Sequence, residues 1–266
     1  MATSERACSW AEQMAVVFAR DMKDDDIAMM GGARHDIPFA AVMLAKNLYC
    51  PNMTVITTGC YVNPTLTAMH YSGHTSVLYS READALINGY DIFEVSETGY
   101  ISFFFYHGIQ MDKHGNVNLH FIGDWKKPTI RGPGAVNISM AVTPNRHYLF
   151  PIRHNKRTFV DKVDFVTLPG FLDGGTSRKD VGIKGGGPCL CASPLGVFDF
   201  EEKSKRMRVK SVHDWVTLDE IVENTGFELI IPDKVLTTQL PTDDELRMLR
   251  EEIDPTGILR GLAGRL

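Results

Sequence analysis

The sequence predicts an α/β protein with an open, mainly parallel sheet flanked by helices. A short apolar strand at Ile27–Met30 ends in a Gly-Gly turn, a helical pattern follows from about Pro38 to Leu48, and a continuous β-branched strand follows at residues 53–58. Strand, glycine turn, helix and strand in this order are typical of a βαβ unit. A continuous apolar strand is typical of a parallel sheet that is covered on both faces.

The composition limits the class of protein. The chain has 266 residues, of which 44% are hydrophobic and 23% charged, and a formal net charge of -5. Such a chain can bury a large core, and its composition argues against disorder. Its acidity argues against nucleic acid as a partner, no apolar run reaches the roughly 18 residues of a membrane helix, and no secretory leader is legible. We expect a cytoplasmic protein with neither nucleic acid nor a membrane as partner, and its five scattered cysteines are expected to be buried thiols.

The other elements follow in chain order. Apolar residues on one face predict a first helix from Trp10 to Phe18, which the aspartates at 24–26 close. Residues 81–94 have a helical pattern, with Ala85, Leu86 and Gly89 facing inward. Further strands are predicted at residues 101–106, after the turn at 112–115 from Val117, at 148–150, at 163–168 and within 190–200.

The C-terminal part carries two helix-start signals. Thr217 stands three residues before Glu220, which is the spacing of a capping box, and residues 241–245 repeat the pattern. Asp254-Pro255 ends the last helix. No internal repeat and no interdomain linker is visible, so we expect one domain over residues 1–266 with a helical tail from about 241 to 266.

Three loops could carry chemistry, because α/β folds bind ligands at the carboxyl ends of parallel strands. They are Thr57-Thr58-Gly59-Cys60, the stretch from His107-Gly108 to Gly115-Asn116, and Arg131-Gly132-Pro133-Gly134-Ala135. Each also has a plain structural interpretation, since Gly-Asn is a common turn pair. Residues 182–187 lack the Lys-Ser/Thr of a phosphate-binding P-loop.

Other polar groups give weaker signals. His70 and His74 could share a helix face as metal ligands, but Gly73 and the lack of a carboxylate nearby argue against it, so we predict no metal. The basic run at 153–157 could bind a phosphate, although such runs are more often a solvated face. No Ser-His-Asp arrangement and no G-x-S-x-G elbow is legible.

Many stretches in one order carry a family resemblance from about Glu12 to Pro255. They are Met-Asp-Lys-His-Gly-Asn-Val-Asn at 111–118, Ile-Gly-Asp at 122–124 with Pro128, Gly-Pro-Gly-Ala at 132–135, Asp-Phe-Val-Thr at 164–167 with Pro169-Gly170, Leu-Gly-Val-Phe at 195–198, Glu-Asn-Thr-Gly-Phe at 223–227 and Arg-Glu-Glu-Ile-Asp-Pro at 250–255. Together they resemble the B-type (beta) subunit of the class I CoA-transferases, most closely that of glutaconate CoA-transferase.

The resemblance implies an A-type subunit as partner, in a heterodimer or heterotetramer, and an acyl-CoA substrate, with no cofactor besides the CoA that the substrate carries. Backbone amides of glycine loops hold the thioester oxygen in this family, and such a donor is typically worth ~3–4 kcal/mol of barrier. Pro133 stands where the family has glycine and removes one donor. The loop residues that the resemblance places near substrate are Gly59, Gly108, Asn116, Gly132, Gly134 and Ala135.

The first loop departs from the family. The transferases carry a glutamate in a Glu-Ser-Gly-like turn, and its carboxylate attacks the thioester. Thr57 stands in its place here, and a threonine hydroxyl without a base beside it is no substitute. The related hydrolase that opens steroid rings as CoA thioesters has a Thr-x-Gly turn there, and its B-type subunit is similar at 193–200 and 240–247. A decarboxylase of a branched glutaconyl-CoA also lacks the glutamate.

We therefore expect a B-type subunit of an acyl-CoA enzyme that breaks a C–C bond, by ring-opening hydrolysis or decarboxylation. Thr57, Thr58 and His107 are the candidate catalytic residues of this chain, and a glutamate of the A-type subunit is expected to act as acid or base. Two alternatives stay open. One is a CoA-transferase that moves CoA between carboxylic acids, and the other is a non-catalytic structural subunit.

Overall fold

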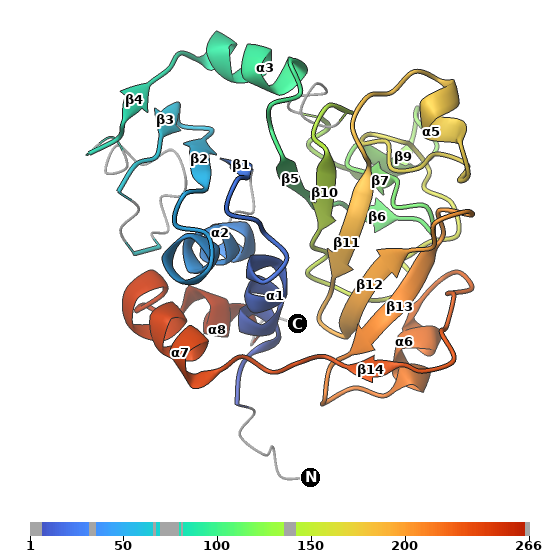
Figure 1. Cartoon of the computed structure of the whole chain (residues 1–266). Helices are drawn as coiled ribbons and strands as arrows, with labels where there is room; N and C mark the ends of the chain where they lie inside the picture. Colours follow the sequence, from blue (N-terminus) through green and yellow to red (C-terminus); the bar gives the residue numbers. More distant parts are fainter. Residues whose placement is uncertain are drawn as a thin grey trace. The chain divides into compact units, whose positions relative to one another are not determined.

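The computed structural model describes residues 7–31, 36–65, 68–69, 80, 82–135 and 142–263 (Figure 1). The chain divides into two compact units. The first comprises Met1–Ile92 with Gln239–Leu266, and the second comprises Phe93–Thr238. Each unit is described by itself, and a single domain over the whole chain stays a prediction.

The first unit is built on the predicted βαβ arrangement. β1 (Ile27–Met30) and β2 (Thr54–Thr57) pair in parallel, and α2 (Asp36–Leu48) connects them in sequence. β3 (Tyr61–Val62) and β4 (Ala85–Leu86) add antiparallel, which gives the order β1-β2-β3-β4 in this unit. α1 (Trp10–Ala19) packs against α2, and a capping box of Ser9 and Glu12 starts it.

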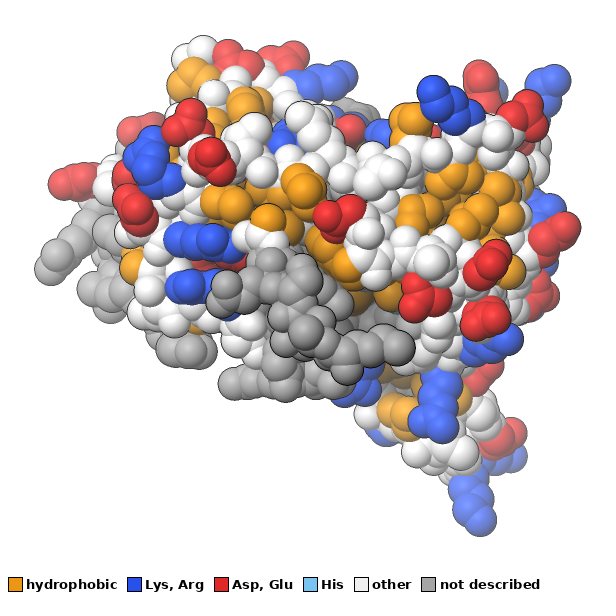
Figure 2. Space-filling view, turned by 90° about the horizontal axis from the view of Figure 1, so that it is seen from below, with side chains coloured by type: hydrophobic (Ala, Val, Ile, Leu, Met, Phe, Trp, Pro, Cys, Tyr) orange, Lys and Arg blue, Asp and Glu red, His pale blue; other side chains and the backbone are white. Residues whose placement is uncertain are grey.

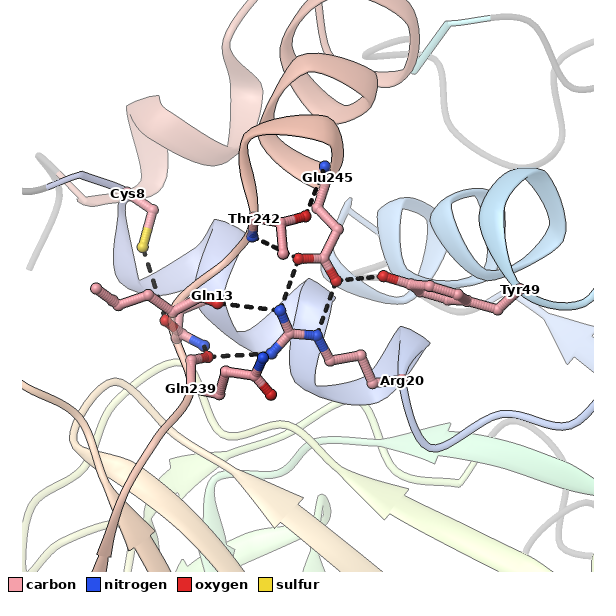
Figure 3. A network of polar contacts seen from close by, with 8 residues as sticks. Cys8, Gln13, Arg20, Tyr49, Gln239, Thr242 and Glu245 are labelled. Atoms are coloured by element: carbon pink, nitrogen blue, oxygen red, sulfur yellow. Dashed lines mark hydrogen bonds and ion pairs between the residues drawn. The ribbon is translucent and has the colours of Figure 1, made fainter.

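The C-terminal segment completes the first unit with α7 (Asp243–Arg247), a π-helical turn (Met248–Ile253) and α8 (Ile258–Ala263). Glu245 in α7 is 1% exposed and accepts from Arg20 Nη2 at 2.6 Å and from the Tyr49 hydroxyl (Figure 3). Arg20 also donates to the carbonyl oxygen of Gln239. The pair is partly buried, and a hydrogen bond to a charged group is typically worth about 1.5–3 kcal/mol, so this network fixes the tail to α1 and to the end of α2.

The second unit has the strand order β14-β13-β12-β11-β10-β5. β5 (Phe103–Tyr106), β10 (Arg146–Leu149) and β11 (Pro188–Ala192) are parallel, and β12 (Gly196–Phe200) and β13 (Met207–Val212) follow antiparallel, with β14 (Leu236–Thr237) parallel to β13. Two hairpins lie outside this sheet, β6 (Gln110–Met111) with β7 (Val117–Asn118) and β8 (Phe121–Gly123) with β9 (Pro128–Arg131). The helices with defined bounds among the described residues are α3 (Gly89–Glu97), whose residues span the division of the chain, α5 (Ser177–Asp180) and α6 (Leu218–Asn224). The predicted α/β class with a mainly parallel sheet is confirmed.

The core of the second unit packs side chains of the sheet against those of the connecting loops. Phe159 and Phe198 are fully buried in it, and the imidazole of His154 stacks on Phe159 with ring centres 3.8 Å apart.

All five cysteines of the chain are free thiols. No helix within the described residues is long and apolar enough to cross a membrane. Lysine and arginine side chains are interspersed with aspartate and glutamate over the face in Figure 2.

Two predicted elements are wrong. In place of a helix over 81–94, Ala85 and Leu86 form strand β4 with both side chains exposed, and the helix begins only at Gly89. The Asn88 side chain accepts from the amides of Tyr90 and Asp91, which starts the helix there.

The strand predicted at 163–168 does not form either. Of these residues only Leu168 makes a β-bridge, opposite Val117, and Phe165 and Val166 are exposed. A β-branched segment forms a strand only where a neighbouring strand can pair with it, and here the pairing with Val117 ends after one residue.

Candidate functional site

The turn after β2 is the first of the predicted loops. The Thr58 amide donates to the Met30 carbonyl at 2.9 Å, which extends the parallel pairing by one residue, and the Cys60 amide donates to the Thr57 carbonyl at 2.9 Å. Cys60 has a φ of 72°, a left-handed conformation that is uncommon for residues other than glycine. The turn therefore reverses the chain at the carboxyl ends of β1 and β2, where α/β sheets bind ligands.

The two threonines of this turn have different environments. Thr57 is fully buried, and its hydroxyl accepts from the Tyr61 amide at 3.3 Å. Thr58 is half-buried, and its Oγ1 is buried without a hydrogen-bond partner in the part of the chain that the structure describes. A buried hydroxyl without a partner costs about 1–3 kcal/mol. Thr58 is therefore the threonine whose polar group is unused by the described part of the chain.

Two glycines shape the surroundings of Thr58. A Cβ atom on Gly31 would lie 2.1 Å from Thr58 Oγ1, so only glycine lets this side chain lie against the end of β1. The Gly59 amide donates to no acceptor among the described residues. The turn thus holds two neutral hydrogen-bonding groups that no described residue uses, of which the Thr58 hydroxyl is shielded from solvent.

The second loop uses its polar side chains for structure. Asn116 is 3% exposed, and its Oδ1 accepts from the amides of Gly170 and Leu172 at 2.9 and 3.0 Å. Its Nδ2 donates to the Asp112 carboxylate at 2.9 Å and to the Leu172 carbonyl at 2.8 Å. Burial raises the pKa of Asp112, although the Asn116 amide groups oppose this. Contact of Asn116 with substrate stays a prediction, and the fold already occupies this side chain.

The beginning of the second loop is tightly packed. A Cβ atom on Gly108 would lie 2.3 Å from Val117 Cγ1, so the glycine permits a close approach to β7. His107 follows β5, is half-buried and lies edge-on to the Phe150 ring at 5.3 Å. A catalytic role for His107 stays a prediction.

The third loop lies against the chain before β8. The Gly132 amide donates to the His120 carbonyl at 2.7 Å, and the Gly134 amide donates to the Leu119 carbonyl at 2.9 Å. Pro133 has no N–H. Of the amides at 132–135, only that of Ala135 lacks an acceptor within the described ranges. An oxyanion contact of Gly132 or Gly134 stays a prediction, and in this conformation both amides are already used.

His120 lies beside this loop and was missed from the sequence. Its Nδ1 is 2.7 Å from the Thr167 hydroxyl, which also accepts from the Leu119 amide at 2.9 Å. A Cβ atom on Gly134 would lie 3.4 Å from His120 Nε2, so this half-buried ring turns its second nitrogen towards the loop. An imidazole held at one nitrogen and open at the other is suited to general acid–base chemistry. The signal that could have found it is the pairing of β8 with β9, which sets residue 120 against Gly132.

Of the other histidines, His154 is bonded on both ring nitrogens within the fold. His154 Nδ1 is 2.8 Å from Ser193 Oγ and Nε2 is 3.0 Å from Thr225 Oγ1, and burial lowers the pKa of His154 to about 3. His70 and His74 lie outside the described residues. Where side chains are described, no group of three His, Cys, Asp or Glu could hold a metal ion.

The basic residues differ in burial. Arg153, Lys156 and Arg157 of the basic run are exposed. Arg178 is 5% exposed, and burial lowers its pKa to about 10. Its guanidinium donates to five backbone carbonyls, those of Val142, Pro169, Gly170, Lys184 and Gly185. All its donors are used, so Arg178 holds the glycine-rich segment 182–187 in place.

Comparison with known proteins shows similarity to one family model and to several subunits of CoA-dependent enzymes. The family model described as coenzyme A transferase matches residues 11–224. The chain is 28% identical over 254 residues to the B-type subunit of glutaconate CoA-transferase of Acidaminococcus fermentans, with 92% of each chain covered. It is 31% identical over 259 residues to the B-type subunit of 3-oxoadipate CoA-transferase of Pseudomonas knackmussii, with 97% of this chain and 98% of the relative covered. Over 154 residues it is 32% identical to the IpdB subunit of the cholesterol ring-cleaving hydrolase of Rhodococcus jostii, with 56% and 58% covered.

Solved structures share the fold. Glutaconate coenzyme A-transferase from Acidaminococcus fermentans superposes with a TM-score of 0.85 at 25% identity, and covers 95% of this chain and 97% of its own. The decarboxylase AibA/AibB superposes with a TM-score of 0.82 at 22% identity, and covers 96% and 99%. The second likeness is one of fold alone.

Proposed function

Because the chain belongs to the coenzyme A transferase family, we propose that it is the B-type subunit of a heteromeric acyl-CoA enzyme that cleaves a carbon–carbon bond. The reaction is either ring-opening hydrolysis of a cyclic β-keto thioester or decarboxylation. Ring-opening hydrolysis adds water to the ring ketone and releases the electron pair of the broken bond to the α-carbon, whereas decarboxylation of a glutaconyl-type thioester releases CO2 and leaves the pair on the γ-carbon. In both cases the pair is conjugated with the thioester carbonyl, which accepts it as an enolate or dienolate. The protein must stabilise this oxygen and deliver one proton to carbon, and hydrolysis also needs a base that activates the water.

The observation that carries the proposal is that the turn after β2 has no carboxylate in its own sequence. No aspartate or glutamate occurs from Ile37 to Arg81. Glu82 and Asp84 follow in the chain; the Glu82 carboxylate accepts from the Thr65 hydroxyl, and that of Asp84 accepts from the Asn63 side chain. The segment 57–60 itself therefore supplies no carboxylate that could form an enzyme–CoA thioester.

The groups that the turn does offer suit an enolate. The Thr58 hydroxyl and the Gly59 amide are neutral and lack partners among the described residues. Removal of one such donor from an oxyanion typically costs ~3–4 kcal/mol of barrier. A threonine hydroxyl is unionised near pH 7, so Thr58 binds and orients and does not attack.

The proton for the carbon that receives the electron pair has two candidate sources. In this chain, His120 Nε2 beside Gly134 is the imidazole nitrogen turned to a glycine loop. The other is the glutamate expected in the A-type subunit. His120→Gln would lower turnover and remove the corresponding limb of the pH–rate profile if His120 supplies the proton.

The partner is proposed from the relatives, and the setting from the sequence. The two relatives that cover most of the chain are named as B-type subunits of CoA-transferases. We extend this to an A-type subunit for the present chain, in a heterodimer or heterotetramer in the cytoplasm. CoA enters as part of the substrate, and the proposal includes no metal and no further cofactor.

A second candidate is a CoA-transferase, which is favoured by the names of these same two relatives. The experiment that separates the two follows CoA in the complex with the A-type subunit. Cyclic β-keto and glutaconyl-type thioesters are supplied together with a free carboxylic acid. We expect CoA to stay on the shortened or opened product. Transfer of CoA to the added acid with ping-pong kinetics would establish the transferase.

The third possibility is a structural subunit. It would be supported if Thr58→Val and His107→Ala both leave turnover of the complex unchanged. Because Thr58 Oγ1 has no structural partner among the described residues, loss of turnover in Thr58→Val with unchanged stability argues for a direct role.

A further inference from the structure

The hairpin of β8 and β9 presents a basic and aromatic turn. The Asp124 carboxylate accepts from the amides of Lys126 and Lys127 at 2.8 and 3.3 Å, and the Gly123 amide donates to Asp164 at 2.7 Å. These bonds fix the backbone of the turn. The side chains of residues 125–127 are exposed on it.

An exposed indole stands at this turn. Trp125 is 57% exposed, and its ring meets the buried Phe121 ring edge-on at 5.2 Å. The Arg131 guanidinium carbon lies 4.6 Å from the centre of the Trp125 ring, and Nη2 donates to the Trp125 carbonyl at 3.1 Å. Nucleotide bases stack on exposed aromatic side chains, and arginine adds a cation–π contribution to such sites.

Positive charge gathers around the indole. Lys126, Lys127 and Arg131 lie within seven residues and are exposed, and no ion pair joins any of them to a carboxylate among the described residues. Asp124 and Asp164 also lie at this turn, so the three cations leave a local excess of one positive charge, against a net charge of -5 for the whole chain. Lysine and arginine are the side chains that bind phosphate groups.

The hairpin is continuous with the glycine loop. Neighbouring rings run from Trp125 through Phe121 and Phe165 to His120, with centres 5.2, 5.5 and 4.6 Å apart. His120 in turn lies against Gly134. Strand β9 covers about 13 Å between the turn and the loop. A ligand with one end at the glycine loop and a phosphorylated aromatic end beyond it would fit this distance.

We propose that Trp125, Lys126, Lys127 and Arg131 bind the phosphorylated adenosine end of the acyl-CoA substrate. The adenine stacks on the exposed indole, and the phosphates pair with the two lysines and the guanidinium. This inference rests on the proposed function only in that the substrate is an acyl-CoA. It assigns the hairpin to substrate affinity and leaves the chemical step to the loops.

The test uses the complex with the A-type subunit and the double variant K126A/K127A. We expect KM for acyl-CoA to rise about tenfold or more, which is about 1.4 kcal/mol, with kcat unchanged. KM for the corresponding acyl-pantetheine, which has no nucleotide, should stay the same. The matched control is K162A/K210A, which removes two exposed lysines of the same unit outside the hairpin and outside the basic run at 153–157, and it should change neither KM.

The stacking part has its own test. Trp125→Leu keeps an apolar side chain, and it should weaken inhibition by adenosine 3′,5′-bisphosphate at least threefold. An unchanged KM for acyl-CoA in K126A/K127A overturns the proposal. A rise in KM for both substrates, or dissociation of the complex in gel filtration, also overturns it and assigns the hairpin to a protein interface. If the complex does not turn over acyl-CoA at all, the proposed function fails, and direct binding of adenosine 3′,5′-bisphosphate still decides the role of the hairpin.

Discussion

The turn after β2 and the glycine loop after β9 both place glycine beside polar residues at the end of a strand, and they use these residues differently. In the turn, the Thr58 hydroxyl and the Gly59 amide have no partner among the described residues. In the loop, the amides of Gly132 and Gly134 are already bonded to the chain before β8. Glycine serves close packing in the second case and leaves donors open in the first. Chemistry is therefore expected at the unpaired groups and not at every glycine of a glycine-bearing loop.

The largest effect on stability is expected at Gly132, and it tests whether the glycine loop after β9 serves close packing. A Cβ atom on Gly132 would lie 2.1 Å from the Leu119 carbonyl oxygen, so Gly132→Ala requires a backbone shift. We expect a loss of about 3 kcal/mol in the free energy of unfolding, measured with urea. Gly89→Ala is the control, because nothing lies within 4 Å of its added Cβ. Equal stability of the two variants would contradict a packing role.

The second prediction concerns Asn116. Asn116→Ala leaves the Asp112 carboxylate and the amides of Gly170 and Leu172 without their partner. Because each buried group left unpaired costs about 1–3 kcal/mol, we expect a total loss of about 2–4 kcal/mol. Turnover per folded complex should stay within a factor of about two. A stable but inactive N116A protein would instead place Asn116 in the substrate site.

The pH dependence of stability tests the structural role of the buried histidines. Burial lowers the pKa of His154 to about 3 and that of His213 to about 4, against an ordinary value near 6.5. The unfolded chain therefore takes up protons first, and stability is lost as pH falls from about 6.5 towards 3–4. Each of the two histidines should account for a loss of a few kcal/mol, on the order of one per pKa unit. His154→Gln should make this slope shallower in urea unfolding at several pH values, and an unchanged slope would show that His154 is not one of the titrating groups.

The smallest effect on stability is expected at the turn after β2. Thr57→Val removes the acceptor of the Tyr61 amide and should cost about 1 kcal/mol. Thr58→Val removes a hydroxyl without a partner among the described residues, so stability should be unchanged or higher by up to about 1 kcal/mol. Turnover of the T58V complex should nevertheless fall about 100-fold or more, the usual loss for an oxyanion donor. If T57V and T58V behave alike in both measurements, the distinction between the threonines is wrong.

Much of the fold could be predicted because its signals are local. Glycine after a β-branched strand marked the turn at Gly59, and the capping boxes of Thr217 with Glu220 and Thr242 with Glu245 both form. The helix predicted at 81–94 failed because apolar residues at 85 and 86 fit a strand pair equally well once β3 offers a partner. The strand predicted at 163–168 failed because it lacks such a partner.

The site was less predictable, because it depends on which polar groups the fold satisfies. Thr57 and Thr58 are adjacent and identical in type, and only the turn geometry decides that one hydroxyl accepts an amide and the other does not. His120 could not be found without the register of β8 with β9. The family resemblance supplied the subunit type, which no local pattern contains.

The central claim is that this chain does not carry CoA on its own carboxylate. The most direct measurement is mass spectrometry of the complex after incubation with acyl-CoA and trapping with borohydride or hydroxylamine. We predict an unmodified mass for this chain, while the Thr57→Glu variant serves as the carboxylate-bearing comparison. A mass change on a glutamate or aspartate of the wild-type chain, dependent on acyl-CoA, would contradict the claim.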